Sequence, residues 1–204
     1  MPSVDVVIAT IGRPSLEMAM VSACLQTAEC RCVVVADGPN AEAREIFDRV
    51  QCTRRRTQPV YLETPTRLGR GELVHIWYAG QTGAADWLKF LNDDDVLLPQ
   101  AIELMAGKVA DGVTLVTCQM LVNYWRDGHC RSRIAKGALQ PGDIGIGNAM
   151  VRTADYRRIT YRPDVPDADV YRLQELAAMG DVRAVPQPLY VYNAWRTNAH
   201  RGYK

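Results

Sequence analysis

The sequence lacks the features that define several large classes of protein. No apolar run approaches the roughly 18 residues that a membrane-spanning helix needs. A strand-like run follows Met1-Pro2-Ser3 directly, so no signal peptide is visible. The formal net charge is only +1, which gives no support for a protein that coats nucleic acid. We therefore expect a globular cytoplasmic protein without a membrane span.

Zinc-type cysteine pairs are also absent. The six cysteines include no pair with C-x-x-C spacing. Cys30 and Cys32 would lie on one face of a strand, where a metal or redox role is one alternative. Reduced and mostly buried thiols fit a cytosolic protein better.

Apolar runs of strand length alternate with helical patterns in the first half of the chain. This pattern predicts strands at 4–9, 32–36, 60–62 and 87–91, and helices at 16–25, 41–50 and 73–79. Such alternation implies parallel βαβ units in a doubly wound sheet. The second half predicts a helix at 101–109, a β-rich run at 114–125, a helix at 170–179 and a strand at 189–192. A length of 204 residues suits one α/β domain and leaves little room for a second.

Three consecutive aspartates, Asp93, Asp94 and Asp95, follow the strand expected at 87–91. Adjacent carboxylates repel one another, so their position at a strand end indicates that a cation binds there. Mg²⁺ and Mn²⁺ prefer oxygen ligands and often share them with a substrate diphosphate. The alternative is an acidic turn that caps the helix starting near Pro99.

Three polar clusters follow strands of the predicted sheet: Thr10 to Arg13, Asp37-Gly38, and Asp93 to Asp95. In open α/β sheets, ligands bind beyond the carboxyl ends of the strands. The convergence of these clusters on one edge favours a site for a nucleotide diphosphate.

Four segments resemble the family 2 glycosyltransferases, which have the GT-A fold. Residues 4–14 resemble the opening strand and loop of that family, and residues 33–38 its second strand and Asp-Gly turn. Residues 67–71 occupy the place of its Gly-containing helix entry, and 90–99 that of its acidic motif. The resemblance implies a single GT-A domain over 1–204, with a Rossmann-like mixed sheet flanked by helices. Its nucleotide-sugar half would be 1–98 and its acceptor half 99–204.

The resemblance also implies roles for individual residues. Donor-binding residues would be Thr10, Arg13, Asp37, Gly38, Arg67, Asp93 and Asp94, with Asp37 accepting a hydrogen bond from the base. Mn²⁺ or Mg²⁺ would bind Asp93 and Asp95, the two ends of a D-x-D motif. Asn92 stands where the family often has another aspartate, so the register could shift by one and make Asp94 the ligand. His200 would complete the metal site, or else belong to a solvated tail.

The acceptor side is implied by later residues. Asp167-Ala168-Asp169 resembles the acidic pair that supplies the catalytic base of inverting members, and either Asp167 or Asp169 could be that base. Trp125 and Trp195 could stack on an acceptor sugar, although core packing is an equal alternative. His75, in an apolar helix, is expected to be packed rather than catalytic.

The function implied is a metal-dependent, inverting transfer of a sugar from a nucleotide-diphosphate donor, a UDP-sugar, to an acceptor hydroxyl. The acceptor could be a glycan, a lipid, a protein, a small molecule or a modified nucleic-acid base. One alternative is a sugar-phosphate nucleotidyltransferase, but the first loop is Ala9-Thr10-Ile11-Gly12-Arg13 rather than G-x-G-T-R. Another is a non-catalytic nucleotide- or carbohydrate-binding module on the same fold.

Overall fold

The computed structural model describes residues 1–51, 58–126, 129–160 and 168–194. Within them, the helices are α1 Leu16–Cys24, α2 Ala41–Gln51, α3 Gly71–Ala79, α4 Ala101–Ala106, α5 Thr153–Tyr156 and α6 Ala168–Met179, with a 3₁₀ turn, η1, at Ile146–Asn148. The strands are β1 Val4–Thr10, β2 Arg31–Ala36, β3 Val60–Glu63, β4 Trp87–Asn92, β5 Val96–Leu97, β6 Val113–Arg126, β7 His129–Ala135, β8 Ala149–Arg152 and β9 Asp181–Ala194.

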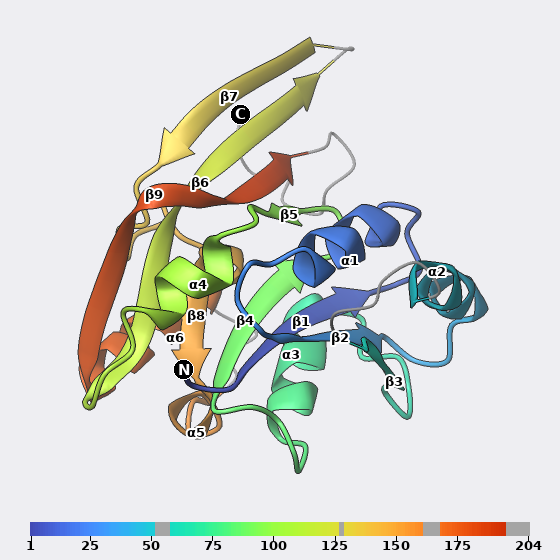
Figure 1. Ribbon diagram of the computed structural model, residues 1–204, viewed down its shortest axis with the longest axis horizontal. Coiled ribbons are helices and arrows are strands. Elements are labelled where there is room, and N and C mark those ends of the chain that lie inside the picture. The colour runs from blue at the N-terminus through green and yellow to red at the C-terminus, as the bar shows by residue number, and fades with distance from the viewer. Residues whose placement is uncertain (52–57, 127–128, 161–167, 195–204) are drawn as a thin grey trace.

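One mixed sheet joins these strands in the order β3-β2-β1-β4-β8-β6-β9-β5, and β7 pairs with β6 (Figure 1). The strands β3, β2, β1 and β4 are parallel, and α1, α2 and α3 connect them. Every residue of β1 is buried, as in a parallel sheet with both faces covered. The doubly wound arrangement predicted for the first half is therefore confirmed.

Helices cover both faces of the sheet. On one face, Leu16, Met20 and Phe47 from α1 and α2 join a core cluster with residues of α4. On the other face, Val74 of α3 and Leu173 of α6 pack against the sheet. The α/β fold with a mixed sheet between helices is thus the one expected, while the division at residue 98 stays a prediction.

The second half is built differently. β8 runs antiparallel between β4 and β6, while β6 and β9 are parallel to each other. The last strand spans Asp181–Ala194 rather than 189–192, and β5, β7 and β8 were not predicted. Six of the seven residues of β7 are exposed, so this strand has none of the alternating burial that marks a strand in a sequence. The β6–β7 hairpin extends beyond the helices (Figure 1).

Candidate active site

The three polar clusters meet at one edge of the sheet. Strand pairing places Ala9 opposite Asn92, and Thr10 opposite Ala36, so β1, β2 and β4 end level with one another. The backbone N–H of Asp37 donates to the carbonyl of Thr10 at 2.9 Å. The predicted convergence at the carboxyl edge is therefore present.

Asp93 is held by the end of β1 and by the loop that follows it. The hydroxyl of Thr10 donates to Asp93 Oδ2 at 2.8 Å, and Arg13 Nη1 lies 2.9 Å from Asp93 Oδ1. The same Arg13 nitrogen lies 3.3 Å from Asp94 Oδ2. Arg13 therefore offsets the repulsion between the first two aspartates while its own side chain stays 43% exposed.

Asp95 has a different environment from its two neighbours. Its side chain is fully buried, and Oδ1 accepts a hydrogen bond from the backbone N–H of Asn193 at 2.8 Å. Oδ2 accepts from the Tyr190 hydroxyl and from Asn92 Nδ2. Burial, followed by the charge of Asp94, raises the pKa of Asp95 to about 7. Asp95 thus anchors β9 to the aspartate loop, and a cation there would compete with three protein donors.

Asp37 supports the loop that precedes α3. Its two carboxylate oxygens accept from the backbone N–H groups of Leu68 and Gly69, at 2.5 and 2.8 Å. Gly38 has a φ of +83°, and a Cβ there would lie 3.2 Å from the backbone nitrogen of Arg67. These contacts bring Asp37, Gly38 and Arg67 together beside the aspartates, while their nucleoside-binding roles stay predictions.

The predicted base lies on a separate element. Asp169 occupies the first turn of α6 and is half-buried. Burial raises the pKa of Tyr156, and the Asp169 carboxylate adds to that rise, so Asp169 lies near Tyr156. Asp167, Trp195 and His200 lie outside the described residues.

Three residues behind the aspartates were missed by the sequence analysis: Lys89, Tyr190 and Asn193. Lys89 is fully buried on β4, where Nζ donates to the carbonyls of Phe90 and Gly147 and lies 4.7 Å from the centroid of the Tyr190 ring. Burial lowers the pKa of Lys89 to about 8. Only Lys89 could have been noticed in the sequence, as a charged residue within the apolar run 87–91. Tyr190 and Asn193 are too distant in sequence from the aspartates to be connected with them.

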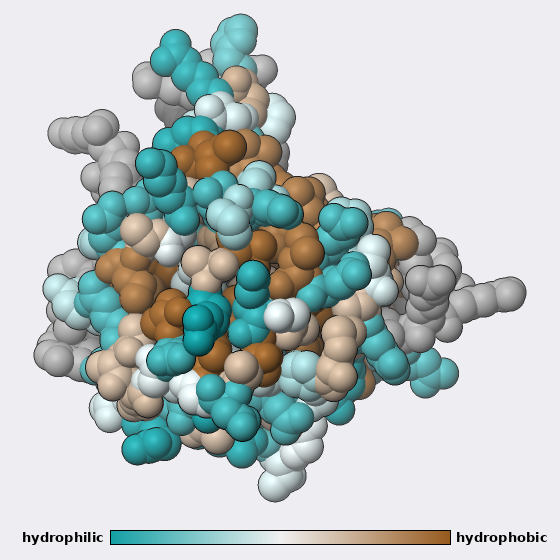
Figure 2. All heavy atoms as spheres, turned by 60° about the vertical axis from the view of Figure 1, so that its left-hand side comes forward, coloured by the Kyte–Doolittle hydropathy of each residue, from teal (hydrophilic) through white to brown (hydrophobic). Residues whose placement is uncertain are grey.

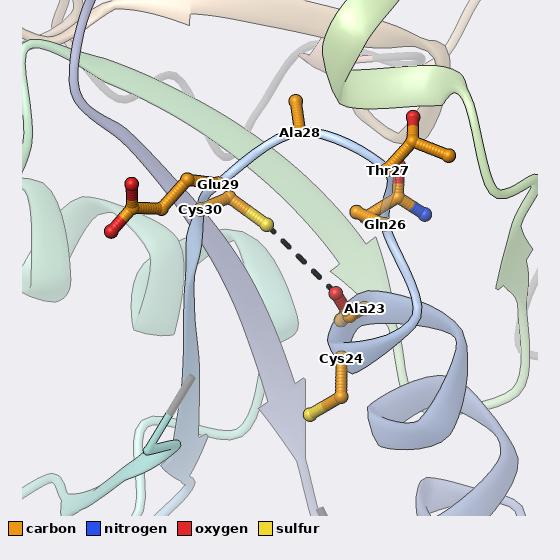
Figure 3. Close-up of a pocket in the computed structure, with 7 residues that line it drawn as sticks. All are labelled: Ala23, Cys24, Gln26, Thr27, Ala28, Glu29 and Cys30. Carbon is orange, nitrogen blue, oxygen red and sulfur yellow. Dashed lines mark hydrogen bonds between the residues drawn. The ribbon is translucent and has the colours of Figure 1, made fainter. Parts of the chain in front are cut away.

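The cysteines near α1 lie away from this site. Cys24 and Cys30 line a pocket between the end of α1 and the start of β2, where Cys30 Sγ points toward the carbonyl oxygen of Ala23 at 3.8 Å (Figure 3). Since β2 begins here, the pocket lies at the amino edge of the parallel strands. Burial raises the pKa of Cys30 to about 12. Cys24 and Cys30 are therefore buried free thiols, as expected.

The aspartate loop suits a divalent cation that shares its ligands with a substrate. Among the residues described, no group of three or more His, Cys, Asp or Glu side chains forms a metal cage. Mg²⁺ and Mn²⁺ are commonly held by one or two carboxylates together with substrate phosphates. Asp93 and Asp94, paired here with the guanidinium of Arg13, provide such a donor set.

An acidic loop and an Asp-Gly turn lie at the carboxyl edge of the parallel strands of this mixed sheet, an arrangement that fits the GT-A fold. The family model "Glycosyl transferase family 2" matches residues 5–170. The chain therefore belongs to this family, as the resemblance predicted. No curated protein matched the sequence.

Solved structures with the same fold include two nucleotide-sugar complexes. S. aureus TarS 1-349 with UDP-GlcNAc has a TM-score of 0.72 and 11% identity, over 99% of this chain and 61% of that one. The mannosyltransferase PcManGT from Pyrobaculum calidifontis, with GDP-Man and Mn²⁺, has a TM-score of 0.65 and 16% identity, over 99% of this chain and 59% of that one. This chain thus spans about 60% of their length. In the described part of the chain, no helix has the length and apolar character needed to cross a bilayer.

Proposed function

We propose that the chain is a metal-dependent, inverting glycosyltransferase that moves a sugar from a UDP-sugar to an acceptor hydroxyl. The observation that carries this proposal is the contact of Thr10 and Arg13 with Asp93 and Asp94 at the carboxyl edge of the sheet. Further support comes from the similarity to TarS, whose solved structures include complexes with UDP and UDP-GlcNAc. The complex of PcManGT with Mn²⁺ supports a divalent cation.

In this proposal, the donor lies across the carboxyl ends of β1, β2 and β4. Asp37 and the loop that it holds border the nucleoside, and Arg13 can turn from the carboxylates toward the donor's phosphates because its side chain is partly exposed. Asp93 and Asp94 would hold the cation, which would offset the charge that develops on the leaving diphosphate. We prefer Asp94 to Asp95 as the second ligand, because both oxygens of Asp95 already accept protein hydrogen bonds.

A carboxylate at the start of α6 takes the proton from the acceptor hydroxyl. Asp169 lies in the first turn of this helix, where the helix dipole stabilises its charged form. A carboxylate that stays ionised can accept the proton as the hydroxyl attacks the anomeric carbon. In-line displacement by that oxygen inverts the configuration. Asp167 remains the alternative base.

The test is release of nucleoside diphosphate from UDP-GlcNAc, UDP-glucose and GDP-mannose, with Mn²⁺, with Mg²⁺ and with EDTA. We expect turnover of a UDP-sugar that needs the metal, and a loss of at least about 100-fold in Asp94→Asn, which keeps the side-chain shape but removes the charge. Asp48→Asn is the matched control, because Asp48 is exposed on α2 and pairs with Arg44. Turnover that is unchanged by EDTA would refute metal dependence, and tight UDP binding without turnover would indicate a binding module.

A further inference from the structure

The β6–β7 hairpin carries an aromatic ring that the core does not use. Trp125, near the end of β6, remains 36% exposed. The hairpin stands clear of the helices (Figure 1), and hydrophilic and apolar side chains both lie on its surface (Figure 2). A ring that is more than one-third exposed contributes less to folding than a buried ring of the same size.

Hydrogen bonds fix the polar edge of this ring. Trp125 Nε1 lies 3.5 Å from Asn193 Oδ1, and Asn123 Nδ2 donates to the same oxygen at 3.3 Å. Asn123 in turn accepts from the hydroxyl of Ser132 at 2.7 Å. The indole is therefore held by its N–H, and amide and hydroxyl groups flank it.

Asn193 connects this ring to the aspartate loop. Its Nδ2 donates to the backbone carbonyl of Asp94 at 2.9 Å, and its backbone N–H donates to Asp95 Oδ1 at 2.8 Å. One side chain thus bonds both the indole of Trp125 and the peptide of Asp94. The ring is therefore linked through one residue to the loop that is proposed to hold the donor's cation.

We propose that Trp125 is an acceptor subsite that stacks on a pyranose ring of a glycan, and that Asn193 is the residue that positions it. A pyranose ring has an apolar C–H face and a rim of hydroxyl groups. The indole offers a flat apolar surface, and Asn123 and Ser132 offer hydrogen-bonding groups beside it. This inference rests on the proposed function, because the subsite has a purpose only if a sugar acceptor is used.

The test compares binding of oligosaccharides with binding of UDP, in the presence of Mn²⁺, by calorimetry. Neutral and anionic oligosaccharides, with cellobiose and chitobiose among them, serve as probes. We expect Trp125→Ala to weaken glycan binding at least about tenfold, and Trp125→Phe, which keeps a ring, less than about threefold. Tyr124→Ala is the matched control, since Tyr124 is 40% exposed but points to the other face of β6. All variants should bind UDP as the wild type does.

The role of Asn193 has its own measurement. UDP and Mn²⁺ should change the fluorescence of Trp125, which is obtained by subtracting the signal of Trp125→Phe from that of the wild type. In Asn193→Ala, this UDP-dependent change should be lost although UDP still binds. A change that persists in Asn193→Ala would refute the positioning role.

Three results would overturn the subsite. They are UDP binding without binding of any oligosaccharide, equal glycan affinity in the wild type and Trp125→Ala, and binding of oligothymidylate alone through Trp125. Failure of the wild type to bind any nucleotide sugar would instead reject the proposed function itself.

Discussion

His75 should make the protein less stable in mild acid. Its side chain is 1% exposed on α3, its ring stacks on Phe90 with 4.4 Å between centroids, and neither ring nitrogen has a hydrogen-bond partner in the described structure. Burial, with smaller contributions from the charges of Arg172 and Lys89, lowers the pKa of His75 to about 3. The imidazole therefore stays neutral in the folded protein, which also fits a packed rather than catalytic residue.

The size of this loss of stability follows from the linkage between proton binding and folding. Below pH 6.5 the unfolded chain binds a proton on His75 that the folded protein does not bind, so stability is present above the unfolded pKa and is lost as the pH falls. Between pH 7 and pH 5 this loss is about 2 kcal/mol, provided only that the folded pKa is below 5. Asp95 acts in the opposite sense, since its raised pKa favours the folded state at low pH.

The assay is urea unfolding of the wild type and of His75→Leu at pH 7 and pH 5. Asp95 is present in both proteins, so its contribution cancels in the difference. We expect the free energy of unfolding of His75→Leu, relative to the wild type, to rise by about 2 kcal/mol from pH 7 to pH 5. His129→Leu, which removes an exposed imidazole, is the control and should show the same difference at both pH values. An unchanged difference for His75→Leu would refute the reasoning.

Three further predictions concern the site. Asp37→Ala should weaken UDP and GDP binding by similar factors and lower the free energy of unfolding by about 1–3 kcal/mol, because two loop N–H groups lose their acceptor; calorimetry that shows a loss for UDP alone would instead support contact with uracil. Tyr190→Phe should lower the free energy of unfolding in urea by about 1–3 kcal/mol, because Asp95 loses a buried hydrogen-bond donor. An unchanged unfolding midpoint would contradict the role of Asp95 as an anchor for β9. Asp169→Asn should slow sugar transfer by ~10²–10⁴ while the affinity for UDP stays unchanged. Full activity of Asp169→Asn, or a loss of activity in Asp167→Asn instead, would show that Asp169 is not the catalytic base.

The first half of the fold could be predicted because its information is local. Buried parallel strands appear as continuous apolar runs such as Val4–Thr10, and Asn40 marks the start of α2 by accepting from the N–H of Ala43 at 2.8 Å. The second half could not be predicted to the same extent. β7 is nearly all exposed, and β9 depends on pairing with β6, which lies far away in sequence.

The acidic loop shows the same division within a single motif. Three adjacent aspartates at a strand end favour a bound cation, because an opposite charge offsets their mutual repulsion. The different environments of the three come from distant parts of the chain: Arg13 pairs with Asp93 and Asp94, while Tyr190 and Asn193 surround Asp95.

The sequence by itself determined the class of protein, the sheet edge that carries the site and the residue types of that site. The sheet edge follows from hydrophobic periodicity and from the positions of polar segments, whereas the class of protein follows from the resemblance of short motifs to a known family. Tertiary structure decided that Asp95 is a buried anchor, that Asp37 holds a loop, and that Trp125 is joined to the aspartates through Asn193. The physical reason is that burial and hydrogen bonding depend on partners up to 99 positions away, as between Asn193 and Asp94.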